Sequence, residues 1–328
     1  ARAVAMRLVR ARARLGRARP PRVFVTSLPK AGTHLATAAL DELPHMRYSG
    51  WHVTPQDFGQ PDSSPPTSAE RPDPPVTRDA RSAPIGADAP SVRRSSSAVD
   101  WDTLAATLSA VPQGRFVRAH FPWSERLVEL LRSLGYRTVF VYRDPRDIAV
   151  SHAFYVTRLR RNVLHRRYAH GFASDSERIL ASIVGSPADS TGPAVPHIGA
   201  PLEAYLPWRT TPGVLASRFE DLVGAEGGGS SEAQLGALQD IARHVERPLG
   251  PGEARRLAAR VWSPRSMTFR RGVVGDWRNH FERQHREAFR GRGARLLVAY
   301  GYERDEGWIE RAETVARGSA PTPGELAR

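Results

Sequence analysis

The stretch Arg22–Thr33 reads RVFVTSLPKAGT and combines a strand pattern, a loop and the start of a helix. RVFVTS (22–27) is an apolar, β-branched run, which predicts a buried strand. The LPKAGT loop follows, and a helical pattern begins at Thr33 and ends near Leu43. A strand, a tight loop and a helix in this order present backbone N–H groups and a helix N-terminus to a phosphate. The stretch therefore predicts an anion-binding loop at the end of a strand.

Strands and helices alternate along the rest of the chain. Short apolar runs predict further strands within 114–122, 137–142 and 212–222. Ser124 is suited to cap the helix that Gly135 ends. This alternation predicts an α/β fold, a single domain with a central, mainly parallel sheet flanked by helices. The expected helices cover 124–134, the stretch from RDPRD through about Arg161, and 233–245, 252–260 and 282–300.

Three segments differ from this pattern. Residues 1–21 are rich in Arg and Ala and contain no acidic residue, which is typical of a basic arm. Residues 56–100 are rich in Pro, Ser and Asp and nearly free of large apolar side chains. Such a segment buries too little surface to offset its ordering entropy, so we expect a disordered insertion or a mobile lid there. The main domain is expected to span 22–312, followed by a tail at 313–328.

The composition excludes several classes of protein. The 328 residues are 40% hydrophobic and 25% charged, which excludes a collagen-like or wholly disordered chain. The absence of cysteine excludes a disulfide scaffold, a thiolate zinc site and a cysteine nucleophile, and favours a cytoplasmic location. No apolar run reaches the roughly 18 residues of a membrane-spanning helix. The net charge of +14 favours an anionic partner.

The basic residues are strongly biased. Lys30 is the only lysine among 48 basic residues. A lysine that survives this bias is a candidate for a task that needs a compact charge rather than a planar guanidinium.

Three motifs are candidates for carrying chemistry. The loop 28–33 lacks the G-x-x-x-x-G-K-[ST] spacing, which disfavours a standard nucleotide-binding P-loop. Arg143 follows a strand, at the position where ligands bind in open α/β sheets, and suits a phosphate; an ion pair with Asp147 is the alternative. In FRRGVVGDWRNHF (269–281), two arginines precede a glycine and can close over a phosphate, with Gly275 and Trp277 fixing the turn.

Together these motifs resemble those of the cytosolic, small-molecule sulfotransferases that use 3′-phosphoadenosine 5′-phosphosulfate (PAPS). LPKAGTH (28–34) is similar to the family's YPKSGTT loop, VFVYRDPRDIAVSHAFY (139–155) to YxxRNPKDxxxSxxxF, and FRRGVVGDWRNHF to RKGxxGDWKxxF. The resemblance implies a P-loop-NTPase-like sulfotransferase fold. It implies transfer of a sulfonate group from PAPS to a hydroxyl or amine of a small-molecule acceptor, with 3′,5′-ADP as product and no metal ion.

The resemblance also implies roles for individual residues. Lys30 matches the lysine that neutralises the leaving 5′-phosphate, and Phe219 falls where the family often has a tyrosine near the adenine. His120 in RAHFP (118–122) is similar to the histidine base of the family's KTHxP segment, and an imidazole with a pKa of about 6.5 is a usable base. The expected contacts to the donor come from Lys30, Ala31, Gly32, Thr33 and His34 in the loop, from Arg143 and Ser151 at the 3′-phosphate, and from Arg270, Arg271 and Gly272 in a C-terminal clamp.

The chain departs from the family pattern at several positions. Ala31 replaces a serine, His34 a threonine and Leu35 a tryptophan. The family's dimer signature KxxxTVxxxE reads RNHFERQHRE (278–287) and keeps only its ends, which leaves the oligomeric state open. Two other function classes stay open: a P-loop-type, ATP-dependent small-molecule kinase, and an arginine-rich nucleic-acid-binding protein, whose binding would depend steeply on salt. The resemblance itself predicts no specific nucleic-acid partner.

Overall fold

A computed structural model describes residues 20–59, 99–261 and 272–308. The chain divides into two compact units. The first takes its described residues from Ala1–Arg143 and Pro207–Val274, and the second from Asp144–Leu206 and Gly275–Arg328. The chain therefore leaves the first unit directly after Arg143 and returns to it at Pro207.

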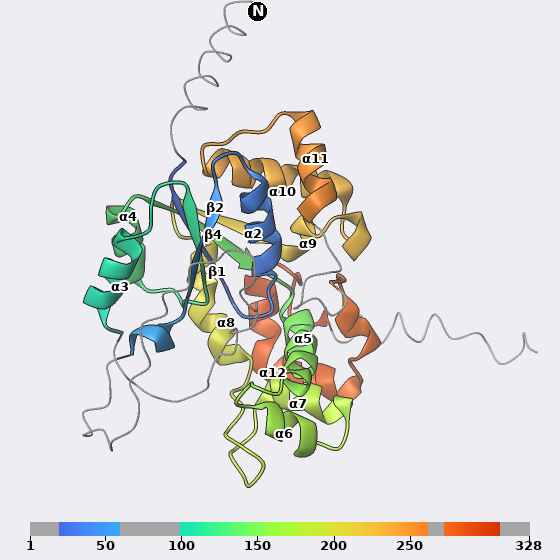
Figure 1. Cartoon of the computed structure of the whole chain (residues 1–328). Coiled ribbons are helices and arrows are strands. Elements are labelled where there is room, and N and C mark those ends of the chain that lie inside the picture. Colours follow the sequence, from blue (N-terminus) through green and yellow to red (C-terminus); the bar gives the residue numbers. More distant parts are fainter. Residues whose placement is uncertain (1–19, 60–98, 262–271, 309–328) are drawn as a thin grey trace, which may run out of the picture. The chain divides into compact units, whose positions relative to one another are not determined.

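A five-stranded sheet forms the centre of the first unit (Figure 1). All four pairings between its strands are parallel, and the strand order is β2-β3-β1-β4-β5. The central strand, β1, and its neighbour β4 are buried along nearly their whole length, as expected for a parallel sheet covered on both faces. This confirms the predicted α/β fold. The strands are β1 (Arg22–Ser27), β2 (Arg47–Val53), β3 (Arg115–Ala119), β4 (Tyr136–Tyr142) and β5 (Val214–Arg218).

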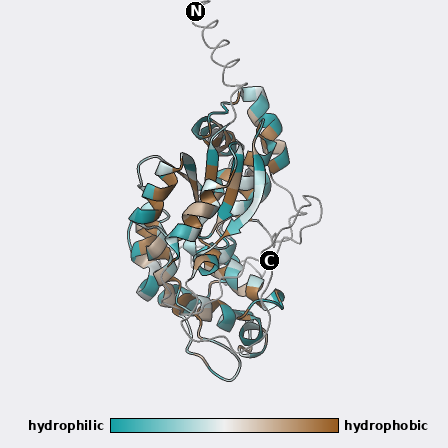
Figure 2. Ribbon diagram, turned by 60° about the vertical axis from the view of Figure 1, so that its left-hand side comes forward, coloured by the Kyte–Doolittle hydropathy of each residue, from teal (hydrophilic) through white to brown (hydrophobic). Residues whose placement is uncertain are grey.

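Helices cover both faces of this sheet. On one face, Val23 and Val25 of β1 and Val139 and Val141 of β4 pack in a core with α2, α10 and α11. On the other face, α4 packs against β4 (Figure 1). Hydrophobic residues are frequent along the strands that lie between the two layers of helices (Figure 2). The helices of this unit are α2 (Thr33–Glu42), α3 (Trp101–Ser109), α4 (Glu125–Ser133), α9 (Phe219–Leu222), α10 (Ser231–His244) and α11 (Pro251–Val261).

The two ends of the segment 56–100 are part of the described fold. Pro55–Phe58 form a 3-10 helix, η1, whose Phe58 side chain is buried. Gly59 pairs antiparallel with Val99, and the N–H of Asp100 donates to the carbonyl of Phe58 over 2.6 Å. The buried Phe58 side chain and this bridge hold the two ends of the segment in place. Residues 60–98 lie outside the described residues, as do most of the basic arm and the tail.

The described residues of the second unit are mainly helical. The Arg146 side chain, 3% exposed, forms ion pairs with Asp144 and Glu303 and lies 4.1 Å and 4.7 Å from the ring centroids of Trp277 and Trp308. These contacts hold the start of α5 against Trp277, Glu303 and Trp308. The helices here are α5 (Pro145–Arg158), α6 (His165–His170), α7 (Asp175–Val184), α8 (Gly199–Tyr205), the 3-10 helix η4 (Asp276–Asn279) and α12 (Arg283–Ala299). Within the described ranges, no helix has the length and apolar character needed to cross a bilayer.

Candidate active site

The LPKAGT loop lies at the carboxyl end of β1 and turns sharply into α2. Lys30 and Gly32 adopt left-handed backbone conformations, with φ of 72° and 99°. The N–H of Ala31, which is fully buried, donates to the carbonyl of Leu28 over 3.1 Å and closes the turn. Gly32 caps α2, and no side chain in the described part of the chain caps this end. The first N–H groups of α2 are thus suited to bind an anion.

Both the backbone conformation at position 32 and the ring that packs against it require a glycine there. A Cβ at this position would lie 2.5 Å from Cδ2 of Phe219, the first residue of α9. The same ring, 4% exposed, lies under Arg143, whose guanidinium carbon is 4.1 Å from the ring centroid. Phe219 therefore packs against both the loop and Arg143.

Arg143 follows β4 and joins the sheet to the segment that begins at Gly272. Its side chain donates from Nη2 to the carbonyl of Val273 over 2.9 Å. The N–H of Val274 donates to the carbonyl of Gly227 over 2.8 Å, and Gly272 has a φ of 59°. Residues 272–274 are thereby held at the carboxyl ends of the strands, where the loop also lies.

His120 is oriented by the last residue of β1. Its Nδ1 lies 2.8 Å from the carbonyl oxygen of Ser27. Because a carbonyl only accepts, Nδ1 carries the hydrogen, and the lone pair of the neutral ring is on Nε2. The hydroxyl of Ser27 bonds to that of Thr33, at the start of α2. Ser27 thus connects the loop to His120, although it lies outside both the LPKAGT loop and the RAHFP segment.

The structure brings most of the predicted site residues together in the first unit. The contacts above link the loop Lys30–His34 to His120, Phe219 and Arg143. Gly272 directly precedes Val273, whose carbonyl accepts from Arg143. His34 is half-buried in the first turn of α2, and its carbonyl accepts from the Thr37 hydroxyl over 3.2 Å. Ser151 lies on α5 in the second unit, and Arg270 and Arg271 lie outside the described residues.

Asp147 has a role that its sequence position did not indicate. Its buried carboxylate accepts from the N–H groups of Gly275 over 2.9 Å and Trp277 over 2.8 Å. Asp147 thereby fixes the turn of the GDW motif, with Gly275 at a φ of 73°. An acidic residue in the first turn of a helix and a glycine turn many residues later were the only signals in the sequence.

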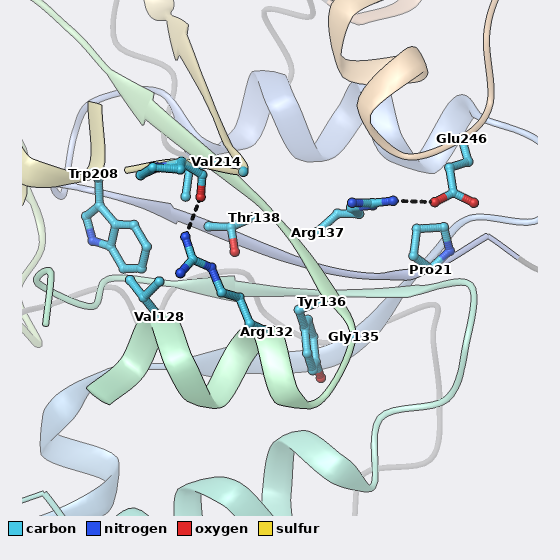
Figure 3. Close-up of a pocket in the computed structure, with 12 residues that line it drawn as sticks. Pro21, Val128, Arg132, Gly135, Tyr136, Arg137, Thr138, Trp208, Val214 and Glu246 are labelled. Atoms are coloured by element: carbon cyan, nitrogen blue, oxygen red, sulfur yellow. Dashed lines mark hydrogen bonds and ion pairs between the residues drawn. The ribbon is translucent and has the colours of Figure 1, made fainter. Parts of the chain in front are cut away.

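A cavity of about 390 Å³ lies elsewhere in the first unit (Figure 3). Its lining includes Tyr136 and Val214, at the starts of β4 and β5, and the Arg137–Glu246 ion pair of 2.7 Å. Ligands of open parallel α/β sheets bind at the carboxyl ends of the strands. The cavity at the opposite ends is therefore not the candidate active site.

Comparison with known proteins places the fold. No family model and no curated protein sequence matches the chain. The structure of mouse sulfotransferase SULT7A1 complexed with PAP is 15% identical, covers 93% of each chain and has a TM-score of 0.51. Retinol dehydratase in complex with androsterone and the inactive cofactor PAP is 17% identical, covers 85% of this chain and 81% of its own, and has a TM-score of 0.50. The chain therefore has the sulfotransferase fold.

Proposed function

We propose that the protein is a sulfotransferase that moves a sulfonate group from PAPS to a hydroxyl or amine of a small-molecule acceptor. One observation carries the proposal: Ser27 joins the anion-binding loop to His120, at the carboxyl end of β1 in a sulfotransferase fold. The two similar structures contain PAP, the 3′,5′-ADP that remains when PAPS loses its sulfonate group.

The loop suits the donor's 5′-phosphosulfate group. Gly32 leaves the backbone accessible because it has no side chain, and the first N–H groups of α2 have no side-chain cap among the described residues. Sulfuryl transfer, like phosphoryl transfer, accumulates negative charge on the leaving oxygen. Lys30 supplies a compact positive charge there. Arg143 and Gly272, with Ser151, Arg270 and Arg271, are the candidates for holding the 3′-phosphate.

His120 suits the role of general base. As the acceptor oxygen bonds to sulfur, Nε2 of His120 takes its proton, and the sulfur–oxygen bond to the 5′-phosphate breaks with its electron pair going to the phosphate. The ring then carries a positive charge, which the hydrogen bond from Nδ1 to the Ser27 carbonyl stabilises. Proton transfer to Nε2 needs the tautomer with its hydrogen on Nδ1, which the contact with the Ser27 carbonyl selects.

Ligand-induced stabilisation tests the donor and separates the competing functions. Saturation with 3′,5′-ADP at about 100 times its Kd should raise the unfolding free energy by about 2.7 kcal/mol. ATP with Mg²⁺ should stabilise little. Stabilisation by ATP with Mg²⁺ alone would favour the kinase, and stabilisation only by DNA or RNA, in a salt-dependent manner, would favour the nucleic-acid-binding protein.

The acidity of the acceptor tests the base. His120→Ala should lower kcat by about 10²–10⁴-fold, the usual range for removal of a general base, and leave the Kd of 3′,5′-ADP nearly unchanged. A phenol that is already ionised needs little proton removal, so the loss should shrink across a series of increasingly acidic phenols. An equal loss for alcohols and acidic phenols would assign His120 to packing instead.

A further inference from the structure

A second imidazole contacts the candidate base. His52, near the end of β2, pairs in register with Arg118 of β3. The ring centroids of His52 and His120 are 5.0 Å apart, and their planes meet at 86°. The edge of one ring thus meets the face of the other, an arrangement that favours one relative orientation. We infer that His52 is a positioning residue for proton transfer at His120, an inference that rests on the proposed function.

The contact adds a restraint on the ring of His120. The hydrogen bond from Nδ1 to Ser27 sets the direction in which the ring points, and the backbone N–H of His120 donates to the Val53 carbonyl over 3.0 Å. A hydrogen bond from Nδ1 tolerates some rotation of the ring about the Cβ–Cγ bond, and this rotation tilts the ring plane. Tilting moves Nε2, the atom that must meet the acceptor's proton. The ring of His52 limits this tilt.

The backbone of β2 is shaped to deliver His52 to this place. The strand follows the register of β3 through Tyr48, and the register then shifts before His52. Gly50, with a φ of 88°, lies within the shift. Irregularities of this kind re-aim a side chain and are frequent beside active sites. Val53, the next residue, is the one that bonds to the backbone of His120, so strand and base are held together.

Substitutions at residue 52 separate ring contact from strand integrity. His52→Ala should lower kcat by about 10- to 100-fold, the scale of a small misplacement of a reacting group. The KM of the acceptor and the Kd of 3′,5′-ADP should stay within about twofold, because neither depends on the tilt of His120. His52→Phe, which keeps a ring at this position, should recover most of the lost rate. Trp51→Ala, which removes an exposed side chain from the neighbouring position of the same strand, is the control for β2 and should behave as the wild type.

A double-mutant cycle tests whether His52 acts through His120. In the His120→Ala background, His52→Ala should have no further effect on kcat. Additive losses, or a His52→Phe protein as slow as His52→Ala, would overturn the inference.

A spectroscopic readout keeps this test separate from the proposed function. Long-range ¹H–¹⁵N spectra should show His120 of the wild type with its hydrogen on Nδ1, and His52→Ala should broaden or average these signals. Unchanged His120 signals in His52→Ala would overturn the positioning role. Failure of the wild type to bind 3′,5′-ADP or transfer sulfonate would instead overturn the proposed function, and the spectra would still report on His52.

Discussion

Individual residues of the loop satisfy several constraints at once. Lys30 adopts a left-handed backbone conformation, which costs a residue with a side chain roughly 1–2 kcal/mol. Gly32 adopts a similar one at no such cost and lets the ring of Phe219 approach. Strain of this kind persists where the surroundings enforce it and is common at functional sites. The strained residue is also the chain's only lysine. The strained backbone of Lys30 and the retention of a single lysine are both explained if the loop serves to position one ammonium group.

Lys30→Arg tests whether the shape of that charge matters. We expect turnover to fall by more than tenfold, because a planar guanidinium cannot take the place of a compact ammonium group at a reacting oxygen. The Kd of 3′,5′-ADP should stay within a few-fold, since the net charge is unchanged. Steady-state kinetics and calorimetric titration measure the two quantities. A variant that keeps more than about a tenth of the wild-type kcat would remove Lys30 from the chemical step.

Gly32→Ala tests the contact between the loop and Phe219. The new Cβ would lie 2.5 Å from Phe219 at a φ of 99°, so the loop must shift, and we expect 3′,5′-ADP to bind at least about tenfold more weakly. Gly135→Ala is the matched control, because Gly135 has a φ of 71° and open space around its Cβ position. Both variants should lose roughly 1–2 kcal/mol of unfolding free energy from the backbone. Equal ligand affinities in the two proteins would show that the Phe219 contact does not shape the loop.

At the scale of elements, the buried strands and one edge strand, β5, were predictable, and the other edge strand, β2, was not. β1 and β4 lie inside the sheet, so both of their faces are apolar and their sequences read as continuous runs. β2, RYSGWHV, lies at the edge, is largely exposed and contains Gly50, so it offers neither an apolar run nor a regular alternation. The loop motif was predictable because its residues are contiguous. The links through Ser27, Val273 and Asp147 were not, because each joins residues far apart in the sequence.

Asp147→Asn tests how α5 holds the GDW turn. The carboxylate accepts two N–H groups, and an asparagine amide would turn a donor toward one of them. We expect a loss of about 1–3 kcal/mol of unfolding free energy, measured by urea denaturation, and weaker binding of 3′,5′-ADP. Asp175→Asn, which removes an exposed ion pair with Arg178, should cost less than about 1 kcal/mol and leave binding unchanged. Equal effects of the two variants would mean that the turn does not depend on Asp147.

At the scale of the whole molecule, positive charge makes stability sensitive to acid. The chain carries a formal charge of +14 with its 11 histidines neutral. Protonation of histidines below neutral pH adds to this charge and to the self-repulsion of the folded state. His244 also makes a local contribution to the acid sensitivity of stability. Its Nε2–H donates to the carbonyl of Thr138 in β4 over 2.9 Å. Burial lowers the pKa of His244, the charge of Arg137 lowers it further, and the bond to Thr138 partly opposes both.

The pH dependence of unfolding separates the local contribution of His244 from the general one. Its pKa is lowered in the folded protein, whereas in the unfolded chain it lies near 6.5. Between these two values the unfolded state binds the proton more readily, so stability is present above about pH 6.5 and is lost as the pH falls toward the folded-state pKa. His244→Gln keeps an N–H donor for Thr138 and cannot titrate. Urea denaturation from pH 7.5 to 5 should therefore show a smaller loss of stability in the variant. The difference should stay below the roughly 1.4 kcal/mol per pH unit of one full proton, because His244 is only half-buried. Both proteins also carry the general repulsion, so parallel curves for the two would show that His244 does not contribute to acid sensitivity.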